Sequence, residues 1–336
     1  MNQQNSYRET IPPVPEGVSR PLLSVMIPTY NCAHYLRETL ASVLAQDPGP
    51  EVMQIEVVDD YSTKDDPKVV VEELGKGRVG FYRQPQNGGH IKNFQTCLER
   101  SRGKLVHLLH GDDCVRHGFY EKLQRAFEEK PEIGAAFCRQ IHIDEHSHWQ
   151  HISWLEQQES GVLNNWVERI AVQQRIQTPS IVVRRDVYEK LGGFDRRIRY
   201  WGEDWEMWVR IAAQYPVWYE VEPLALYRIG SVSLSGRSVR TGENIQDFRT
   251  AIGIVKNYLP QDSADSLSKQ ALENYAFYAL NEAKKLAGHG DTTAAMNQIR
   301  EALRCCSSLK VIRPALKLRA RLLYRQFFRQ VKQQAV

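Results

Sequence analysis

Short apolar runs alternate with helix-like segments up to about residue 130 of the chain. Four runs are bounded by Gly, Pro or charged residues, which is the pattern of short buried strands. The segments after them place apolar residues at helical spacing. Strands are therefore expected at about residues 24–28, 55–58, 79–82 and 105–109, with helices at about 35–44, 91–101 and 118–129. This repeated β-α order predicts a parallel sheet flanked by helices.

Two of these apolar runs lead directly into a pair of carboxylates. The second run is followed by Asp59 and Asp60, and the fourth by H-G-D-D, which contains Asp112 and Asp113. Open α/β sheets bind ligands at the carboxyl ends of their strands. These acids are therefore the first candidates for chemistry.

The turn Q-P-Q-N-G-G-H precedes the helix expected at about 91–101. Gly88 and Gly89 allow tight backbone at the helix start, where free N–H groups and Lys92 are placed to meet a phosphate. An Asn-Gly-Gly sequence is also an ordinary turn, so both interpretations stay open at this point.

The second half of the chain changes character. A longer strand is expected over 133–143, followed by a segment with four histidines, His142, His146, His148 and His151. Imidazole is a common zinc ligand, but polar residues that alternate beside a turn fit a solvated hairpin face, which we prefer. Further strands are expected at 179–184 and 217–221, and the loop 227–236 is expected to be flexible enough to close over an active site.

The segment 201–212 reads W-G-E-D-W-E-M-W-V-R-I-A. Its apolar spacing places Glu203 and Asp204 in the first turn of a helix with one buried face. Acids at a helix start also satisfy free N–H groups, so a purely structural role is the alternative. The neighbouring rings of Trp201 and Trp205 favour a functional role, because aromatic rings beside carboxylates commonly hold a sugar.

The chain from about residue 243 is expected to be helical, and its end is basic. No acid follows Glu301, and leucines and phenylalanines are interleaved with Lys310, Arg313, Lys317, Arg319, Arg321, Arg325, Arg329 and Lys332. A basic amphipathic helix indicates binding to an anionic membrane surface, and the alternative is a helix that docks on its own domain. Nucleic acid is not expected as a partner, since no DNA- or RNA-binding motif accompanies the helix.

Composition limits the remaining classes. The net charge is only +4, so any basic surface is local. No apolar run approaches the roughly 20 residues that a spanning helix needs, and the polar N-terminus has no signal-peptide core. A cytoplasmic protein is expected, at most peripheral on the cytoplasmic face of a membrane. The six cysteines form no C-x-x-C pair or zinc spacing, and reduced thiols are expected.

Six motifs occur in a fixed order between about Leu22 and Gly236: S-V-M-I-P-T-Y-N, E-V-V-D-D-Y-S-T, N-G-G-x-x-K-N, H-G-D-D, L-G-G-F-D and G-E-D-W. Together they resemble the family-2 glycosyltransferases, inverting enzymes that use nucleotide-sugar donors. The resemblance implies an α/β protein with the GT-A type of mostly parallel sheet flanked by helices. A C-terminal α-helical extension would follow that domain.

The resemblance also implies the nucleotide site. The base would lie in the cradle formed by the I-P-T-Y-N turn and Asp60, which would accept the N3–H of a uracil. Lys92 stands where the family usually has a basic residue facing the nucleotide or its diphosphate, and Asp112 would face the ribose. The implied nucleotide-binding residues are Pro28, Thr29, Tyr30, Asp60, Lys92 and Asp112.

Metal binding and catalysis are implied in the same way. Asp113 would hold Mn²⁺ or Mg²⁺ on the diphosphate oxygens, at a D-x-D-type motif in which the family often has an acid where this chain has His110. The loop 227–233 lacks the histidine that some members offer to the metal. Asp204 would be the catalytic base. Trp201, Glu203 and Trp205 would contact the acceptor or the transferred sugar.

The sequence therefore predicts a metal-dependent hexosyltransferase, with a UDP-sugar as the expected donor. The acceptor would be a hydroxyl of a glycan or lipid-linked molecule, as in cell-surface polysaccharide synthesis. The alternative is a non-catalytic nucleotide-sugar-binding or scaffold protein of the same fold. The expected domains are a flexible tail (1–20), a nucleotide-sugar-binding half (21–130), an acceptor-binding half (131–242) and a helical region with a basic amphipathic end (243–336).

Overall fold

The computed structural model describes residues 6–230 and 234–334 of the chain. The chain forms two compact units, which are described separately here. The sheet unit consists of Met1–Trp166, Arg175–Arg196 and Arg210–Ile229, and the helical unit of Val167–Gln174, Arg197–Val209 and Gly230–Val336. The helical unit thus begins before the expected residue 243 and includes two segments from the middle of the chain.

Ten strands form one mixed sheet within the described part of the sheet unit. Their bounds are β1 Leu23–Thr29, β2 Met53–Asp59, β3 Gly80–Arg83, β4 Leu105–Leu108, β5 Cys114–Val115, β6 Ala135–Ile143, β7 Trp149–Ile152, β8 Gly161–Val162, β9 Ile181–Arg184 and β10 Val217–Arg228. The order is β3-β2-β1-β4-β9-β6-β10-β5, with β7 on β6 and β8 on β10. The longest strands pair in parallel, β1 with β2 and β6 with β10, whereas the antiparallel additions are short.

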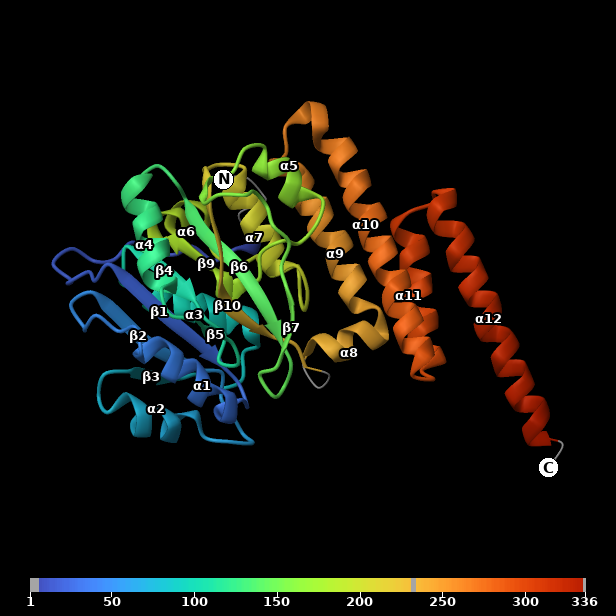
Figure 1. Cartoon of the computed structure of the whole chain (residues 1–336), viewed down its shortest axis with the longest axis horizontal. Helices are drawn as coiled ribbons and strands as arrows, with labels where there is room; N and C mark the ends of the chain where they lie inside the picture. Colours follow the sequence, from blue (N-terminus) through green and yellow to red (C-terminus); the bar gives the residue numbers. More distant parts are fainter. Residues whose placement is uncertain (1–5, 231–233, 335–336) are drawn as a thin grey trace. The chain divides into compact units, whose positions relative to one another are not determined.

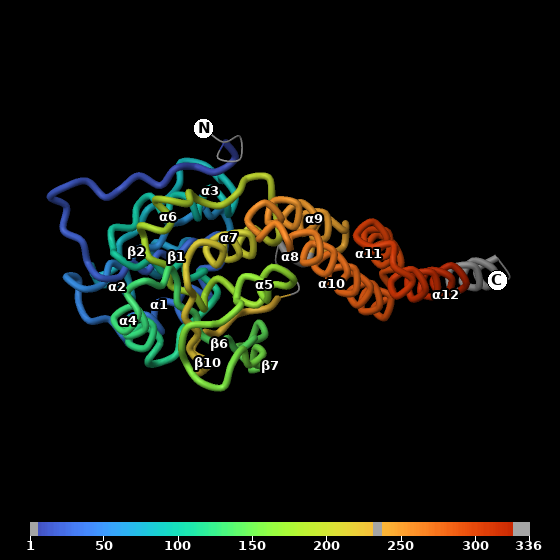
Figure 2. The backbone as a smooth tube through the Cα atoms, turned by 90° about the horizontal axis from the view of Figure 1, so that it is seen from above, coloured from blue at the N-terminus to red at the C-terminus, as the bar shows by residue number. Residues whose placement is uncertain are grey.

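Helices cover both faces of this sheet. Figure 2 shows α3 and α6 on one side of β1, and α1 and α4 on the other. The helices that begin in the sheet unit are α1 Ala33–Leu44, α2 Pro67–Gly75, α3 His90–Arg100, α4 Phe119–Glu129, α5 Trp166–Ala171 and α6 Arg185–Leu191, with the short 3-10 turn η2 Thr178–Ser180. The predicted α/β class with a mostly parallel sheet is confirmed.

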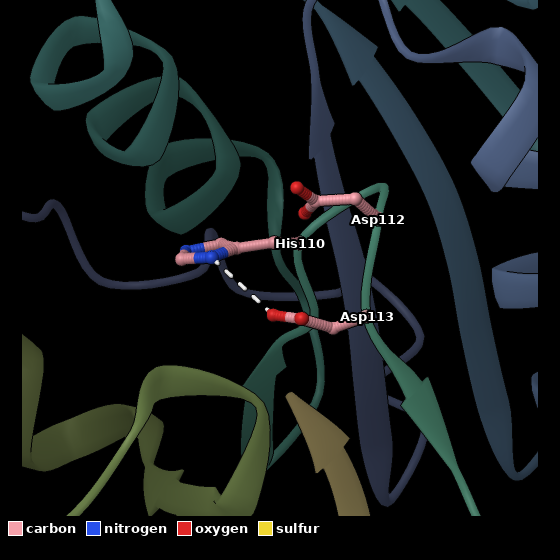
Figure 3. Close-up of side chains that lie close together, drawn as sticks. All are labelled: His110, Asp112 and Asp113. Carbon is pink, nitrogen blue, oxygen red and sulfur yellow. Dashed lines mark ion pairs between the residues drawn. The ribbon is translucent and has the colours of Figure 1, made fainter. Parts of the chain in front are cut away.

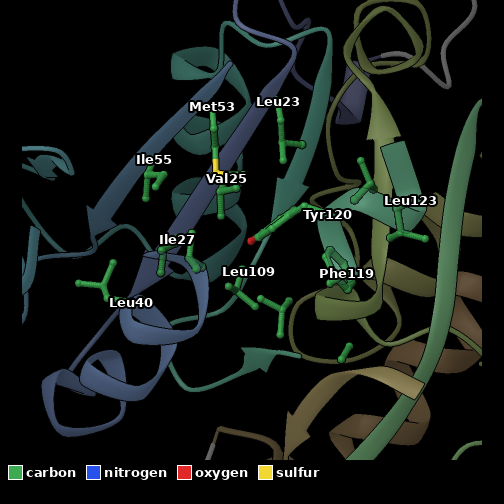
Figure 4. Packing of buried hydrophobic residues seen from close by; sticks show 14 of the residues in the cluster. Leu23, Val25, Ile27, Leu40, Met53, Ile55, Leu109, Phe119, Tyr120 and Leu123 are labelled. Atoms are coloured by element: carbon green, nitrogen blue, oxygen red, sulfur yellow. The ribbon is translucent and has the colours of Figure 1, made fainter. Parts of the chain in front are cut away.

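The core of the sheet unit lies around β1 and β2. Both strands are buried along their whole length, as expected for central strands of a covered parallel sheet. Figure 4 shows Val25 and Ile27 of β1 in one cluster with Leu40 of α1 and Met53 of β2. Burying each such side chain stabilises the fold by about 1.5–3 kcal/mol. This packing fixes the positions at which the carboxyl ends of β1, β2 and β4 emerge.

The helical unit contains the predicted C-terminal helices. They are α8 Leu234–Thr241, α9 Glu243–Val255, η3 Lys256–Tyr258, α10 Gln261–Gly288, α11 Thr292–Cys305 and α12 Leu309–Gln334, preceded by α7 Glu203–Ala212, which ends in the sheet unit. Figure 1 shows α10, α11 and α12 side by side. Asp291 caps α11 by accepting a hydrogen bond of 3.0 Å from the N–H of Ala294, which stabilises the predicted hairpin turn. None of the described helices has the length and apolar composition that crossing a membrane requires.

Residues 6–20, the described part of the N-terminal segment, are not the free tail that the prolines predicted. Within the described residues, Ile11 is buried and the Pro12 carbonyl accepts a hydrogen bond of 3.0 Å from Arg185 Nη2. Arg8 Nε lies 3.3 Å from Asp195 Oδ2. These contacts hold the segment against the sheet unit.

Two other expectations concern loops. The predicted hairpin face is confirmed, because β6 and β7 pair, β7 is exposed, and His142 stacks on His151 with ring centroids 3.9 Å apart. The loop expected at 227–236 is shorter than predicted, since β10 extends to Arg228 and α8 begins at Leu234. Residues 231–233 of that expectation lie outside the described part of the chain.

A buried histidine of β4 makes the fold sensitive to acid. His107 Nε2 lies 3.0 Å from the Pro179 carbonyl, and burial lowers the pKa of the imidazole to about 3. The unfolded imidazole has a pKa of about 6.5, so acid protonates the unfolded chain first and stability falls as the pH drops below that value. Between about pH 7.5 and pH 5 this group removes about 2 kcal/mol from the free energy of unfolding.

We expect His107→Gln to lower stability at neutral pH but to abolish that part of the pH dependence. Urea unfolding at about pH 7.5 and pH 5 measures the free energy of unfolding of the wild type and the variant. The exposed His117, replaced by Gln, provides the control and should keep the wild-type pH dependence. An undiminished pH dependence in His107→Gln would contradict the assignment.

Candidate active site

The buried Asp60 anchors the N-G-G loop. Its carboxylate accepts hydrogen bonds from the N–H groups of Gly88 (2.8 Å) and Gly89 (2.9 Å) and from Asn87 Nδ2 (3.0 Å). Burial raises the pKa of Asp60, and the two glycine N–H groups act against that shift. A carboxylate has about four acceptor positions, so about one is left for a nucleobase. The implied contact between Asp60 and a uracil stays a prediction.

This arrangement alters the expected phosphate site. The N–H groups of Gly88 and Gly89 bind the Asp60 carboxylate and so are not available to a phosphate. Gly89 has φ +80°, a left-handed conformation that favours glycine at the start of α3. Lys92 is half-exposed, and its Nζ lies 3.4 Å from Glu9 Oε2. Gly88 and Gly89 are therefore engaged by Asp60, whereas Lys92 and the first-turn N–H groups of α3 stay the predicted phosphate contacts.

The turn after β1 lies directly beside the turn after β4. The N–H of Gly111 donates to the Pro28 carbonyl at 3.0 Å, and the N–H of Asp60 donates to the Thr29 carbonyl at 2.9 Å. A Cβ atom at Gly111 would lie 2.9 Å from Thr29 Oγ1, so this close approach requires glycine. Tyr30, the next residue of the turn, is exposed. The structure therefore brings Pro28, Thr29 and Asp60 together with the H-G-D-D turn, as predicted.

The H-G-D-D turn holds a cluster of side chains of the types that serve as metal ligands. Ligand atoms of His110, Asp112 and Asp113 all lie within 4.8 Å of one another (Figure 3). Asp113 is buried, and its Oδ1 accepts a hydrogen bond of 2.8 Å from the N–H of Arg228. Its Oδ2 has no hydrogen-bond donor within the described residues and lies 3.6 Å from His110 Nδ1. Burial, with the negative charge of Asp112, raises the pKa of Asp113 well above its usual range.

These residues fit a divalent cation. The buried Oδ2 of Asp113 needs a positively charged or hydrogen-bonding partner, and two carboxylates with one imidazole form a suitable ligand set. Carboxylate oxygens suit Mg²⁺ and Mn²⁺, and imidazole is a ligand for softer transition metals. His110, where the family often has an acid, is therefore a candidate ligand itself.

Arg228 organises the cluster and was missed by the sequence analysis. Its Nε donates to the Asp112 carbonyl at 2.8 Å, its Nη2 to Glu38 Oε2 at 2.9 Å, and its Nη1 to the Asp144 carbonyl at 2.9 Å. The side chain is only 3% exposed. One guanidinium thus joins the H-G-D-D turn to α1 and to the β6–β7 hairpin. A single arginine at a strand end carries no motif, so no sequence signal identified it.

The G-E-D-W segment lies in the helical unit. Asp204 is partly exposed, and its Oδ2 accepts a hydrogen bond of 2.8 Å from Gln174 Nε2. Its Oδ1 accepts one of 2.7 Å from the N–H of Trp205, one of the first-turn N–H groups of α7 that have no partner within the helix. Glu203 is buried beside it. Asp204 and Glu203 thus occupy the first turn of α7, as predicted.

Trp205 cannot stack on a sugar, and this expectation is corrected. The side chain is fully buried, its Nε1 donates to the Ile170 carbonyl at 2.7 Å, and its ring packs edge-to-face on Tyr275. Helical spacing correctly predicted that this face of α7 is buried. Trp205 belongs to that face and is a core residue, so it is not available to a sugar. Trp201 is partly exposed, and its Nε1 donates to Ser238 Oγ at 2.8 Å. Of the two tryptophans, Trp201 therefore keeps an aromatic surface for a ligand.

Asp247 of α9 is a second residue that the sequence analysis missed. Its Oδ2 accepts hydrogen bonds from the N–H groups of Tyr200 (2.7 Å) and Trp201 (3.2 Å), and burial raises its pKa. Gly202, which follows, has φ +88°. Asp247 therefore positions the turn that leads into Glu203 and Asp204.

Residues 24–192 match the sequence profile of Glycosyl transferase family 2. The matched segment spans half of the chain and contains the β1 turn, Asp60, the N-G-G loop and the H-G-D-D turn. The chain therefore belongs to glycosyl transferase family 2.

Two relatives illustrate the range of the similarity. An uncharacterized protein of Mycobacterium tuberculosis is 30% identical over 250 residues, which cover 68% of this chain and 74% of the relative. The minor teichoic acid biosynthesis protein GgaB of Bacillus subtilis is 31% identical over 108 residues, which cover 32% of this chain and 12% of GgaB.

Solved structures share the fold at low sequence identity. S. aureus TarS 1-349 in complex with UDP-GlcNAc has a TM-score of 0.63 at 17% identity, covering 83% of this chain and 81% of TarS 1-349. The mannosyltransferase PcManGT from Pyrobaculum calidifontis, in complex with GDP-Man and Mn²⁺, has a TM-score of 0.54 at 16% identity, covering 99% and 90%.

The buried position of Arg228 leads to a stability prediction. We expect Arg228→Lys to lower the free energy of unfolding by about 2 kcal/mol, because a lysine cannot reproduce the four guanidinium hydrogen bonds to Asp112, Asp144, Ser147 and Glu38. Urea unfolding measures the loss. Arg125→Lys is the matched control, since Arg125 pairs with Glu129 on the exposed face of α4 and should change stability by less than about 0.5 kcal/mol. Equal losses in the two variants would contradict the role of Arg228.

Proposed function

We propose that this family-2 glycosyltransferase moves a sugar from a UDP-sugar to a hydroxyl of a glycan or lipid-linked acceptor, with inversion at the anomeric carbon. The observation that carries the proposal is the cluster after β4. There a buried carboxylate oxygen of Asp113 has no hydrogen-bond donor within the described residues and lies beside Asp112 and His110.

The comparisons support the donor class. TarS 1-349 has been crystallised with UDP and with UDP-GlcNAc, and PcManGT with GDP-Man. The TM-score is higher to TarS, at 0.63 against 0.54, which favours a uridine nucleotide. In this proposal Asp60 uses its remaining acceptor position for the N3–H of the base, and Lys92 leaves Glu9 to meet the diphosphate. The name of GgaB favours a cell-surface polymer as the acceptor.

The metal would be held by Asp113, Asp112 and His110. A bound Mn²⁺ or Mg²⁺ neutralises the diphosphate and stabilises the negative charge that grows on the leaving nucleotide. Arg228 keeps the H-G-D-D turn in place through Asp112 and Asp113. The carboxylate of Asp113, although buried, would then be ionised, because a cation offsets the cost of burying its charge.

The base would be Asp204. The acceptor oxygen forms a bond to the anomeric carbon, the bond from that carbon to the diphosphate oxygen breaks, and UDP leaves with the electron pair. The acceptor proton passes to Asp204, which Gln174 orients through its hydrogen bond to Oδ2. Asp247 positions the preceding turn and does not touch the reacting atoms.

Donor binding tests the nucleotide and metal site. Calorimetric titration with UDP-, GDP-, dTDP- and CMP-sugars, with and without Mn²⁺, should find metal-dependent binding of a UDP-sugar. Asp113→Ala should weaken that binding by about 10–100-fold, because a ligand of the cation is lost. Asp262→Asn, at an exposed position of α10, should bind normally. Binding unaffected by Asp113→Ala would contradict the metal site, and no binding to any donor would favour the scaffold alternative.

Turnover tests the base. We expect Asp204→Asn to reduce the rate of UDP release from the bound donor by about 10²–10⁴-fold, because an amide cannot take the proton. Hydrolysis of the donor serves as the readout, with water as the acceptor, so the natural acceptor need not be known. Donor affinity should be retained in the variant. Wild-type turnover in Asp204→Asn would exclude the role.

A further inference from the structure

One face of helix α12 packs on the helical unit over the residues whose side chains are described. Val311, Ala315 and Leu322 are buried, and α12 contacts α10 and α11. These positions recur at the spacing of one helix face. The side chains are described up to Tyr324, and the inference below uses none beyond it. This face of α12 therefore docks on its own unit, as one of the two interpretations of the sequence predicted.

A second apolar face of α12 is exposed. Leu309, Leu316 and Leu323 are seven residues apart, which places them on one side of the helix. Their exposed fractions are 64%, 51% and 50%, and that of Tyr324 is 65%. At 100° per residue this stripe lies about a third of a turn from the buried face. Among the described residues, no element of the helical unit is drawn on the side of α12 away from α11 (Figure 1).

Basic side chains border this leucine stripe on both sides. Arg313 and Lys317 lie along one edge and Arg319 along the other, and all three are exposed. Residues 309–336 contain eight basic and no acidic residues, although the chain carries a net charge of only +4. The rest of the chain is thus net acidic, and the positive charge is concentrated on this helix.

We propose that the exposed face of α12, formed by the leucine stripe and its basic borders, binds an anionic lipid surface. Leucines between two rows of cations match a layer of anionic headgroups over acyl chains. A second copy of the helix is a poor partner, because its borders carry the same charge and no acid is present to pair with them. A polyanion such as a nucleic acid would leave the leucines in water.

Vesicle flotation of the full chain tests the proposal. The protein should float with phosphatidylcholine vesicles that contain about 30% phosphatidylglycerol and not with phosphatidylcholine alone. Raising the salt to about 0.5 M NaCl should weaken binding, because exposed charges are then screened. Each basic residue near an anionic surface changes partitioning by roughly fivefold, so Arg313→Glu with Lys317→Glu should weaken it by at least about 25-fold.

Two further variants make the test specific. Lys104→Glu with Lys130→Glu makes the same change of net charge at exposed positions of the sheet unit and should leave flotation nearly unchanged. Leu316→Gln with Leu323→Gln should weaken partitioning by at least about tenfold, because the apolar contact with the acyl chains is lost. All six positions are exposed, and circular dichroism and thermal melting should confirm that the variants fold.

Three results would overturn the proposal. Equal loss of flotation in the two charge-reversal variants would show adsorption by net charge. Wild-type flotation of the leucine variant would show that the apolar stripe does not enter the membrane. A dimer that the leucine variant dissociates, measured by light scattering without lipid, would show that the stripe binds a second copy of the chain.

Discussion

The contacts between Arg228 and the H-G-D-D turn hold the candidate site together. The backbone N–H of Arg228 fixes one oxygen of the buried Asp113, and the guanidinium binds the Asp112 carbonyl. The same side chain reaches Glu38 of α1 and the turn of the β6–β7 hairpin. A positive charge is thereby buried near the buried carboxylate of Asp113, which offsets part of the cost of burying that carboxylate. The second oxygen of Asp113 is left for a ligand such as a cation. The fixed position of this carboxylate therefore determines where a cation would bind.

A second set of hydrogen bonds prepares the nucleotide side of the same edge. Asp60 uses three of its acceptor positions on the N-G-G loop, so the loop is shaped before any ligand binds. Gly111 allows the turns after β1 and β4 to touch. In the helical unit, Asp247 holds the turn before Asp204 by accepting a hydrogen bond from the N–H of Tyr200. Gln174 orients the Asp204 carboxylate by donating a hydrogen bond to it. Positioning of this kind raises the reaction rate, because the reacting groups are already ordered before the reaction begins.

The sequence predicted those parts of the fold and site that depend on neighbours along the chain. A strand that ends in a carboxylate, β2 at Asp59, and a helix that starts at Glu203 are local patterns, and both are present. The strand β4 ends earlier, at Leu108, and Asp112 and Asp113 lie in the turn after it. The contacts of Arg228 join residues 84 to 190 positions apart and arise only when β10 pairs with β6 and β5. Periodicity showed that Trp205 faces inward but could not distinguish a core residue from a sugar platform. Likewise, the prolines near the N-terminus predicted disorder, whereas the burial of Ile11 is a tertiary contact.

The central claim is that the cluster after β4 binds the diphosphate of a nucleotide sugar through a divalent cation. A crystal of the protein grown with Mn²⁺ and a UDP-sugar, measured at the manganese absorption edge, tests it most directly. The account predicts an anomalous peak coordinated by Asp113 and by the diphosphate, with the uracil beside Asp60. A bound nucleotide with no metal at Asp113, or manganese on the histidines of the β6–β7 hairpin, would contradict it.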